Sequence, residues 1–584
     1  MIAPMKRVLL GGRACDRKEI LAALQDAGII HVEPVRPETV RVSPELIEET
    51  ENVARAIDLL SALEPSESQI PPPGTPSRLV DELRADMVLL ARLESDKLFL
   101  TAEIERVSPW GHIDRGDIAA LRAVGLHVEF LTCPEGQEDS VKADLKQLIA
   151  NRKGDSFILA VSRTAVTAEA PALRISGLEK DSYDLTAALT TVTEKEKRIK
   201  ENFHEIAKRL DEIREFHNEL TERRRFIEVE SGLANEGEIF VLKGWIPADS
   251  CEAIEQAFEK SRLPVALQFT DPPDDEVPPT KFKNSWWCRP VESLFPLLGV
   301  IPGYREADIS PTFFPFLIVF TAFLVGDAGY GLVAVISMAV AFRPLITRGV
   351  PRPILELFMA LFGGVLIFGI LTNTYFGEAP AFLNLTGFNG STPQGMEFLK
   401  WLCFFIGAVH LTLAHLWKIR RVPMGLPVVG EVGWVLFIWP MFALVNVLVL
   451  GYKAPFWMIP GFVISLGLVV FFTAPSTNVL SMVGQGLGAV ALNAAAFLSD
   501  IISYIRLWAI GLAGGILAAT FNQLAKPLPL VIMVLVLAAA HFMNFALGLI
   551  AIFAHGVRLN LLEFSNHLGM EWSGRPFEPF KKKR

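Results

Sequence analysis

Two arginines, Arg506 and Arg558, stand inside apolar stretches that are long enough to cross a membrane. A guanidinium cannot lose its charge by deprotonation, and placing one in the middle of a bilayer costs roughly 2.5–3.5 kcal/mol even on the lenient scale from insertion experiments. Each arginine therefore needs an acidic partner. Asp500 and Glu563 are the strong acids at hand in the sequence, but we expect the working partner to be a carboxylate of another subunit, presented one at a time.

The two halves of the chain differ sharply in composition. The 584 residues are 51% hydrophobic and 20% charged, which is too apolar for a soluble protein and too charged for a pure membrane bundle. Residues 1–285 are charged and globular, whereas residues 312–564 form nearly continuous apolar runs. We expect a soluble domain, a linker at 286–311, a membrane domain and a tail at 565–584. The net charge of −9 lies mostly on the soluble half, so no nucleic-acid partner is expected.

The soluble half is predicted to hold α/β lobes joined by a long helical hairpin. Alternating strand and helix patterns predict one lobe at the N-terminus and a second at 110–175. A charged helix is predicted at 183–229, with apolar residues at alternating steps of four and three that are typical of a coiled coil. Its expected antiparallel partner is the helix at 78–107. Glu196 and His217 interrupt the apolar seam.

Motifs of common enzymes and metal sites are missing from the soluble half. It contains no phosphate-binding GxxxxGK[ST], no HExxH and no nucleophile elbow, so the chain alone is not expected to be an enzyme. The five cysteines have neither paired nor metal-ligand spacing, which predicts free thiols in a reducing compartment, no metal and no cofactor. A proline-rich break at 71–76 separates two helices. No signal-peptide pattern opens the sequence, so this half is expected to stay in the cytoplasm.

Eight apolar runs predict eight membrane crossings and a cytoplasmic C-terminus. The runs are 312–326, 328–343, 354–375, 399–418, 430–450, 455–473, 485–521 and 530–562. Basic residues gather in the loops that this topology places inside, as the positive-inside rule requires. These residues are Arg343, Arg348, Arg352, Lys418, Arg420, Arg421 and the terminal KKKR. The first two runs meet at Gly326–Gly331 and could instead form one kinked or re-entrant element, which would reverse every later loop. Eight crossings keep the basic loops inside, in a multi-pass protein of the plasma membrane.

The last two runs are unusually long. At about 1.5 Å per residue they would measure roughly 55 and 50 Å, against about 30 Å of hydrocarbon, so we expect them to be tilted or to protrude. Each run carries one arginine on a face of small and polar residues, which lets another helix approach and can hold water. On the last run the face comprises His541, Asn544, Gly548, Ala551, His555 and Arg558, and on the run before it comprises Ser499, Ser503, Arg506, Ile510 and Ala513.

Several of these residues also have an ordinary structural explanation. Arg558 could be an anchor that reaches the membrane interface, whereas Arg506, near the middle of its run, cannot easily do so. His541 and His555 could form hydrogen bonds between helices. Asp327, between glycines, could satisfy the backbone of a broken helix. Interfacial carboxylates and packing histidines are also common in membrane proteins; the candidates for these are Glu378, Glu431, His410 and His415.

Seven short motifs are spread along the chain. They are Ser503–Ala513 (SYIRLWAIGLA), His555–Leu559 (HGVRL), Glu563–Phe564, Phe577–Phe580 (FEPF), Gly326–Gly331 (GDAGYG), Tyr375–Glu378 (YFGE) and Gly244–Pro247 (GWIP). Together they resemble the membrane stator of rotary V/A-type ATPases, called subunit a or subunit I, and the short soluble half is similar to bacterial and archaeal members. The chain departs from the family at Gly548, where eukaryotic members carry an acid, and in the run SNHLGMEWSG after Phe564.

The resemblance implies a stator that forms two ion half-channels against a rotor ring and couples H⁺ or Na⁺ translocation to ATP synthesis or hydrolysis elsewhere in the complex. Arg506 and Arg558 would meet the rotor carboxylate. The implied partners are the ring subunits, peripheral-stalk subunits of the E/G type, membrane lipid and, indirectly, the V1/A1 catalytic sector. The half-channel candidates are His541, Asn544, His555, Glu563, Ser503, Asp500, Asp327 and Glu431.

Two other functions stay open at this point. A self-contained secondary transporter could hold an anionic substrate at a buried arginine, but it predicts an internal repeat that the sequence does not display. A structural membrane scaffold would leave the two arginine-bearing faces unexplained. The sequence is compatible with either ion and with either direction of transport.

Overall fold

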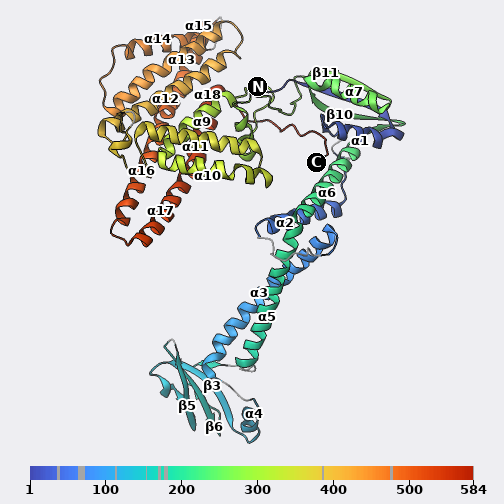
Figure 1. Cartoon of the computed structure of the whole chain (residues 1–584), viewed down its shortest axis with the longest axis vertical. Helices are drawn as coiled ribbons and strands as arrows, with labels where there is room; N and C mark the ends of the chain where they lie inside the picture. The colour runs from blue at the N-terminus through green and yellow to red at the C-terminus, as the bar shows by residue number, and fades with distance from the viewer. Residues whose placement is uncertain are drawn as a thin grey trace. The chain divides into compact units, whose positions relative to one another are not determined.

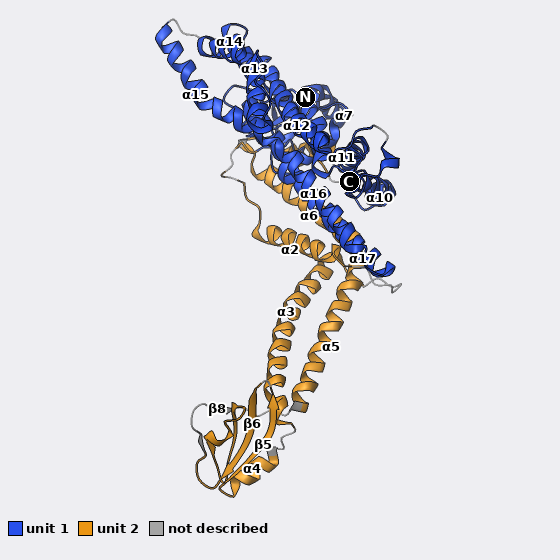
Figure 2. Ribbon diagram, turned by 90° about the vertical axis from the view of Figure 1, so that its left-hand side faces the viewer, with its two compact units in different colours: residues 1–13, 27–33, 242–580 blue, residues 14–26, 34–241, 581–584 orange. Residues whose placement is uncertain are grey.

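The structure is a computed structural model that describes residues 1–35, 38, 40–63, 73–111, 115–152, 154–168, 173–175, 182–384, 387–473 and 478–582. It divides into two compact units (Figure 2). The first unit comprises residues 1–13, 27–33 and 242–580, and the second comprises residues 14–26, 34–241 and 581–584. The boundaries between these two units therefore differ from the boundary at residue 285 that the composition predicts. The proline-rich break expected at 71–76 and the terminal KKKR lie partly outside the described residues.

The second unit contains the helical arm, which we define as α2 (Pro44–Ser61), α3 (Pro76–Val107), α5 (Ser182–Ile206) and α6 (Leu210–Ser231). The helix α3 packs along α5 (Figure 2), and the two run antiparallel, because Lys97 contacts Glu196 while Asn202 bonds to Asp86. The apolar residues of the expected seam line the core of the arm; they include Leu79, Leu83, Ile199, Phe203, Ile206, Ile213 and Leu220.

The helix predicted at 183–229 is interrupted in the structure. A 3₁₀ turn, Ala207–Arg209, separates α5 from α6. The guanidinium of Arg209 donates to the carbonyl of Gly74 at 2.6 Å and also binds Glu212, so a contact distant in sequence fixes this turn. The prediction of one continuous helix was wrong at this point, because periodicity within a segment does not report such a contact.

Two β-sheets match the predicted α/β segments (Figure 1). In one sheet the strands β11 (Val265–Thr270), β1 (Met5–Arg13), β10 (Ile239–Pro247) and β2 (His31–Glu33) lie in this order. Gly244 of β10 lies so close to β2 that an added Cβ would stand 2.6 Å from the carbonyl oxygen of His31, which explains the glycine of the GWIP motif. The other sheet has the order β5 (Leu145–Arg152), β6 (Asp155–Ser162), β3 (His127–Pro134), β8 (Leu173–Ile175).

All eight apolar runs are helical in the structure. Among the described residues six helical stretches are long and apolar enough to cross a membrane, and two apolar helices are shorter. The six are α10 (Ala328–Thr347), α11 (Arg352–Thr372), α12 (Pro393–Ile419), α13 (Leu426–Val445, extended to Leu450), α15 with α16 (Val479–Ser503 and Ile505–Ala525) and the stretch that begins with α17 (Leu530–Ala551). The two shorter ones are α9 (Ser310–Val325) and α14 (Met458–Phe472).

The chain reverses direction between α9 and α10. Contacts of α9 with α11 advance together in both helices, from Ile318 beside Gly364 to Phe323 beside Phe368. The contacts of α10 with α11 run the opposite way, because Ala328 meets Gly369 while Gly331 meets Leu366. Of the two geometries considered for this region, a single kinked helix is therefore wrong. Gly326 allows the reversal through its positive φ of 58°.

The last helix changes type near its second arginine. It continues from α17 through two π-helical segments, η10 (Ile552–Val557) and η11 (Leu559–Phe564), into the short α18 (Ser565–Leu568). The whole stretch has 39 residues, and the α15–α16 stretch before it has 47. Both are longer than the apolar runs alone indicated.

The C-terminal tail returns to the N-terminal sheet. Pro576 forms a parallel bridge with Thr280, in the segment after β11, and Phe580 N–H donates to the carbonyl of Ile30, next to β2, at 2.7 Å. Both contacts lie inside the first compact unit. The tail therefore connects the end of the last helix to the sheet that contains the N-terminus.

Candidate ion-translocation site

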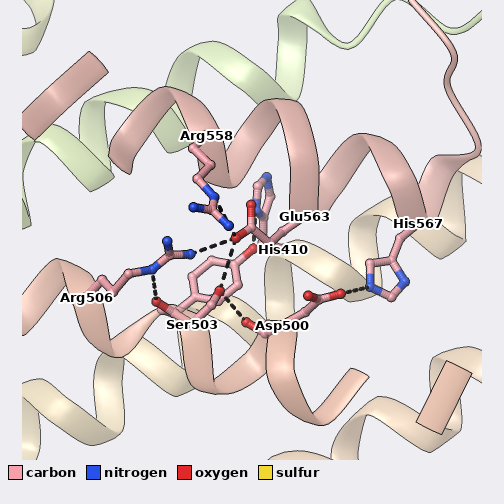
Figure 3. A network of polar contacts seen from close by, with 8 residues as sticks. His410, Asp500, Ser503, Arg506, Arg558, Glu563 and His567 are labelled. Carbon is pink, nitrogen blue, oxygen red and sulfur yellow. Dashed lines mark hydrogen bonds and ion pairs between the residues drawn. The ribbon is translucent and has the colours of Figure 1, made fainter. Parts of the chain in front are cut away.

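An arginine cluster, defined as Arg506, Arg558, Glu563 and Ser503, forms where α16 begins (Figure 3). The Nη2 of Arg506 donates to Glu563 Oε1 at 2.7 Å, and its Nε donates to the carbonyl of Ser503 at 3.0 Å. The Glu563 side chain is only 6% exposed. The partner that Arg506 requires is thus present in the same chain, which adds an internal carboxylate to the expectation of a partner on another subunit.

Arg558 shares the same carboxylate oxygen more loosely. Its Nε lies 3.8 Å from Glu563 Oε1, and its side chain is 51% exposed. Residues five apart point in different directions on an α-helix, but a π-helix bonds residue i to i+5 and places them nearly above one another. The π-helical segment η11 therefore explains how Arg558 and Glu563 come to one side of the helix. In the part of the chain that the structure describes, Glu563 Oε2 is buried without a hydrogen-bond partner.

A second group of polar side chains, the His567 chain, starts beside this cluster and comprises Asp500, His567, His415, Glu431 and Lys418. Asp500 Oδ2 lies 3.0 Å from His567 Nε2 (Figure 3), and His567 Nδ1 lies 3.2 Å from His415 Nε2. His415 Nδ1 lies 2.9 Å from Glu431 Oε2, and Lys418 Nζ lies 2.8 Å from Glu431 Oε1. The His567 chain links α15, α18, α12 and α13, and it ends at the basic loop between α12 and α13.

The Tyr330 cluster, defined as Tyr330, His541, Asn522 and Asn544, lies near the other end of α16. The Tyr330 hydroxyl lies 2.8 Å from His541 Nδ1 and accepts from Asn544 Nδ2 at 2.9 Å. His541 Nε2 lies 3.1 Å from Asn522 Oδ1. Asn522 is 16 positions after Arg506, about 24 Å along the helix axis. The two ends of α16 thus carry different polar groups.

Two hollows adjoin the Tyr330 cluster. One, of about 440 Å³, is lined by Glu378, Asn522, Lys526 and His541, together with apolar side chains. The other, of about 190 Å³, is lined by Tyr330, Asn544, Gly514 and Gly548, together with apolar side chains. A Cβ at Gly548 would meet only Val325, at 3.4 Å. The small residue at the position of the eukaryotic acid thus borders open space.

Asp327 is occupied by the backbone around the reversal between α9 and α10. Its Oδ1 accepts from the N–H groups of Gly329 and Phe376, each at 2.8 Å, and of Tyr330 at 3.2 Å. Its Oδ2 accepts from Gly377 N–H at 2.8 Å. The carboxylate therefore caps α10 and ties it to the YFGE segment, as its ordinary structural explanation requires.

The predicted site residues fall into separate groups in the structure. Arg506, Arg558, Glu563 and Ser503 meet in one cluster, Asp500 and Glu431 belong to the His567 chain, and His541 and Asn544 belong to the Tyr330 cluster. His555 joins none of these by a hydrogen bond, since its Nδ1 is buried without a partner within the described residues. His410, expected to be a packing residue, is buried against the rings of Phe316 and Phe564 and lies 2.8 Å from the Tyr504 hydroxyl.

Sequence reasoning missed His567 and undervalued His415 and Tyr330. His567 lies in the tail sequence that departs from the family pattern, so no motif drew attention to it. A usable signal existed for His415, because it and Glu431 stand at adjoining ends of two successive apolar runs joined by a short loop. Tyr330 stands inside the GDAGYG motif, but its partners on the last helix are more than 200 positions away.

Comparisons with known proteins give a consistent result. No family model matches the sequence. The chain is 28% identical to the V-type ATP synthase subunit I of Borreliella burgdorferi and 27% identical to the V-type ATP synthase subunit I 1 of Treponema pallidum, with 100% of both chains covered in each case. It is 25% identical to the A-type ATP synthase subunit I of Methanocaldococcus jannaschii over 59% of this chain and 55% of that one.

Solved structures also match part of the chain. Among them is the crystal structure of the cytoplasmic N-terminal domain of subunit I, homolog of subunit a, of V-ATPase, at 17% identity, covering 45% of this chain and 100% of that chain. The TM-score is 0.20, so the superposition supports no structural argument. The sequence comparisons confirm the expected resemblance: the chain is similar over its full length to proteins named V-type ATP synthase subunit I, and over 59% of its length to one named A-type ATP synthase subunit I.

Proposed function

We propose that the chain is the ion-translocating stator subunit of a rotary V/A-type ATPase. In this function it forms two half-channels against a ring of rotor subunits and couples H⁺ or Na⁺ translocation to ATP synthesis or hydrolysis in the V1/A1 sector. The chain itself catalyses no reaction. The observation that carries the proposal is the arginine cluster, in which two guanidiniums share one carboxylate oxygen and Arg558 stays half exposed.

The electrostatics of the arginine cluster suit the exchange of carboxylates. A rotor carboxylate that faces lipid must be neutral, because an isolated charge in hydrocarbon is too costly. Beside Arg506 and Arg558 it can ionise and release its ion, since a fixed positive charge favours the carboxylate form. Glu563 would neutralise the arginines between successive rotor subunits. The pair also repels any cation that would leak directly between the half-channels.

The polar side chains near the two ends of α16, those around the arginine cluster and those of the Tyr330 cluster, would line two offset half-channels. The outer one would pass the hollow lined by Glu378 and Asn522, then His541 and Asn544, then the hollow at Gly548, and reach His555. The inner one would use Asp500, Ser503 and Glu431. The backbone contacts of Asp327 suggest that this residue holds the broken helix in place instead of carrying ions.

The remaining assignments follow from the same proposal. The chain crosses the plasma membrane eight times, with the soluble domain and the C-terminus in the cytoplasm. The helical arm acts as a coiled-coil strut that binds peripheral-stalk subunits of the E/G type, and lipid surrounds the membrane half. Six helical stretches that meet the length and hydropathy needed to cross, and two shorter apolar helices, support the count.

Replacement of Arg506 tests the proposal directly. In the purified complex reconstituted into vesicles, Arg506→Ala should abolish ATP-driven ion uptake while the ring still co-purifies, because Arg558 still lies beside Glu563 and the apolar contacts of the helices remain. Arg343→Ala, which removes an exposed arginine at the loop end of α10, is the matched control and should transport normally. Full uptake in Arg506→Ala would refute the proposal. A secondary transporter or a scaffold would purify without a ring of small carboxylate-bearing hairpins.

A further inference from the structure

The His567 chain has the geometry of a proton conductor. We propose that it carries protons between the basic loop at Lys418 and the arginine cluster, which makes H⁺ the transported ion. This inference rests on the proposed stator function and adds to it a path and an ion. It gives His415 and His567 a role that neither the motifs nor the relatives' names assign to them.

Each of the two imidazoles in the His567 chain contacts a different partner with each of its ring nitrogens. His415 faces Glu431 through Nδ1 and His567 through Nε2, at 2.9 and 3.2 Å. His567 faces His415 through Nδ1 and Asp500 through Nε2, the latter at 3.0 Å. All three separations fall within or at the edge of hydrogen-bond range. Four titratable groups on four different elements are thus joined without a gap.

The transfer is balanced at every atom. A proton on Glu431 Oε2 passes to His415 Nδ1, while the proton on His415 Nε2 passes to His567 Nδ1 and the proton on His567 Nε2 passes to Asp500 Oδ2. One O–H and two N–H bonds break, and two N–H bonds and one O–H bond form. No electron is transferred. Both rings finish in the opposite tautomer, so each ring must move its proton from Nδ1 back to Nε2 before the next transfer.

The middle of the His567 chain is buried and its two ends are exposed. His415 is 3% exposed, and the ring of Phe497 stacks on it and lies 4.5 Å from the ring of His567. The Asp500 side chain is 26% exposed at one end, and the Lys418 side chain is 35% exposed at the other. A proton relay needs a buried middle and exposed ends, because side chains must carry the proton only where water cannot.

The same geometry argues against Na⁺. Hard cations in proteins are held by several oxygen ligands at once. Along the His567 chain, two imidazoles separate the carboxylates of Glu431 and Asp500, so the midpoint presents nitrogen atoms to any ion. Lys418 adds a positive charge beside Glu431. A proton can pass such a midpoint by changing bonds, whereas a metal cation would have to displace the rings.

The test uses the whole complex in vesicles and measures ATP-driven proton uptake. His567→Ala should lower uptake at least about 100-fold, the lower end of what a positioned proton-transfer group contributes. Added imidazole should restore uptake, because it can accept a proton at one nitrogen and release another. N-methylimidazole, which has the same shape but only one free nitrogen, should not. His410→Gln, which alters a buried histidine of α12 outside the His567 chain, serves as the control and should respond to neither additive.

Each outcome decides the proposal. Uptake that survives in His567→Ala overturns the relay, and so does a loss that both additives repair equally or that neither repairs, since that pattern assigns His567 a structural role. Uptake of radioactive Na⁺ in place of protons overturns it as well. Arg506→Ala in the same assay distinguishes failure of the relay from failure of the stator function. If His567→Ala transports and Arg506→Ala does not, the relay fails and the stator function stands. If both variants transport, the stator function fails.

Discussion

The helical arm and the membrane half each contain a carboxylate held between two cations. In the arm, Glu196 of α5 binds Lys97 of α3 and Lys200 of its own helix. Hydrogen bonds from Lys200 and Lys97 lower the pKa of Glu196 to about 2. The carboxylate is largely buried, but the two lysines are 41% and 51% exposed. Water can therefore replace either lysine if its contact breaks.

The corresponding group in the membrane half is Glu563 between Arg506 and Arg558. Here the shared carboxylate is almost fully buried, and an uncompensated buried charge costs several kcal/mol. One arrangement of charges thus joins two helices of the arm, and the same arrangement in the apolar half is the place where we propose that rotor carboxylates exchange. The cations differ accordingly, since the fork of a guanidinium can hold two acceptors at once.

Removal of the membrane carboxylate should have the largest effect in this comparison. Glu563→Gln leaves two guanidiniums around a neutral amide, and we expect a loss of about 3 kcal/mol, the low end for breaking a buried pair because Arg506 is partly exposed. Thermal unfolding of the subunit in detergent measures this loss. Glu571→Gln, at an exposed carboxylate of the same C-terminal stretch, should leave the midpoint unchanged. An equal midpoint for both variants would show that Glu563 does not hold the arginines.

Exchanging arginine for lysine, or lysine for arginine, should have an intermediate effect on transport at Arg506 and no effect at Lys97. Arg506→Lys cannot donate to Ser503 and Glu563 together, and losing one hydrogen bond to a charged group, about 1.5–3 kcal/mol, predicts a roughly 10- to 100-fold fall in coupled transport. Lys97→Arg in the arm should leave transport unchanged, because Glu196 accepts either cation. Ion uptake by vesicles measures both variants. Equal transport in the two would remove the distinction between the sites.

Replacement of the arm carboxylate Glu196 should have the smallest effect on stability, and this effect should depend on pH. The folded pKa of Glu196, about 2, lies below its ordinary value of 4.5. Its contribution is therefore complete above pH 4.5 and disappears as the pH falls toward 2. We expect hydrogen exchange in α3 and α5 to be slightly faster in Glu196→Gln than in the wild type at pH 6, with the difference shrinking at pH 3. A difference that grows with acidification would contradict this assignment.

Much of the fold followed from periodicity and hydropathy. Apolar runs of the right length predicted the membrane helices, and a 4–3 repeat predicted which residues line the core of the arm. The 3₁₀ turn at Ala207–Arg209 was missed because it depends on Gly74, more than 130 positions away. The π-helical segments were missed because no local residue pattern encodes an i→i+5 bond.

The candidate site was predicted in parts but not as an assembly. Arg506 and Arg558 were evident because a charge is conspicuous in an apolar run, and Glu563 because it was one of two acids nearby. The pairing of His567 with Asp500 joins two successive helical stretches at positions 67 residues apart. Physical rules for single segments identify which residues are unusual, whereas tertiary packing decides which of them touch.

The return of the C-terminal tail to the N-terminal sheet has a mechanical consequence. The segment that precedes α9 joins the apolar half covalently to that sheet, and the tail that follows the last helix adds noncovalent contacts to it, among them the bridge between Thr280 and Pro576. Arg575 adds an ion pair with Glu33 of β2 at 3.1 Å. A body held by one flexible strand can swivel about it, but a body held by two parallel strands resists twisting. We therefore expect the noncovalent contacts of the tail to limit rotation of the last helix relative to the sheet.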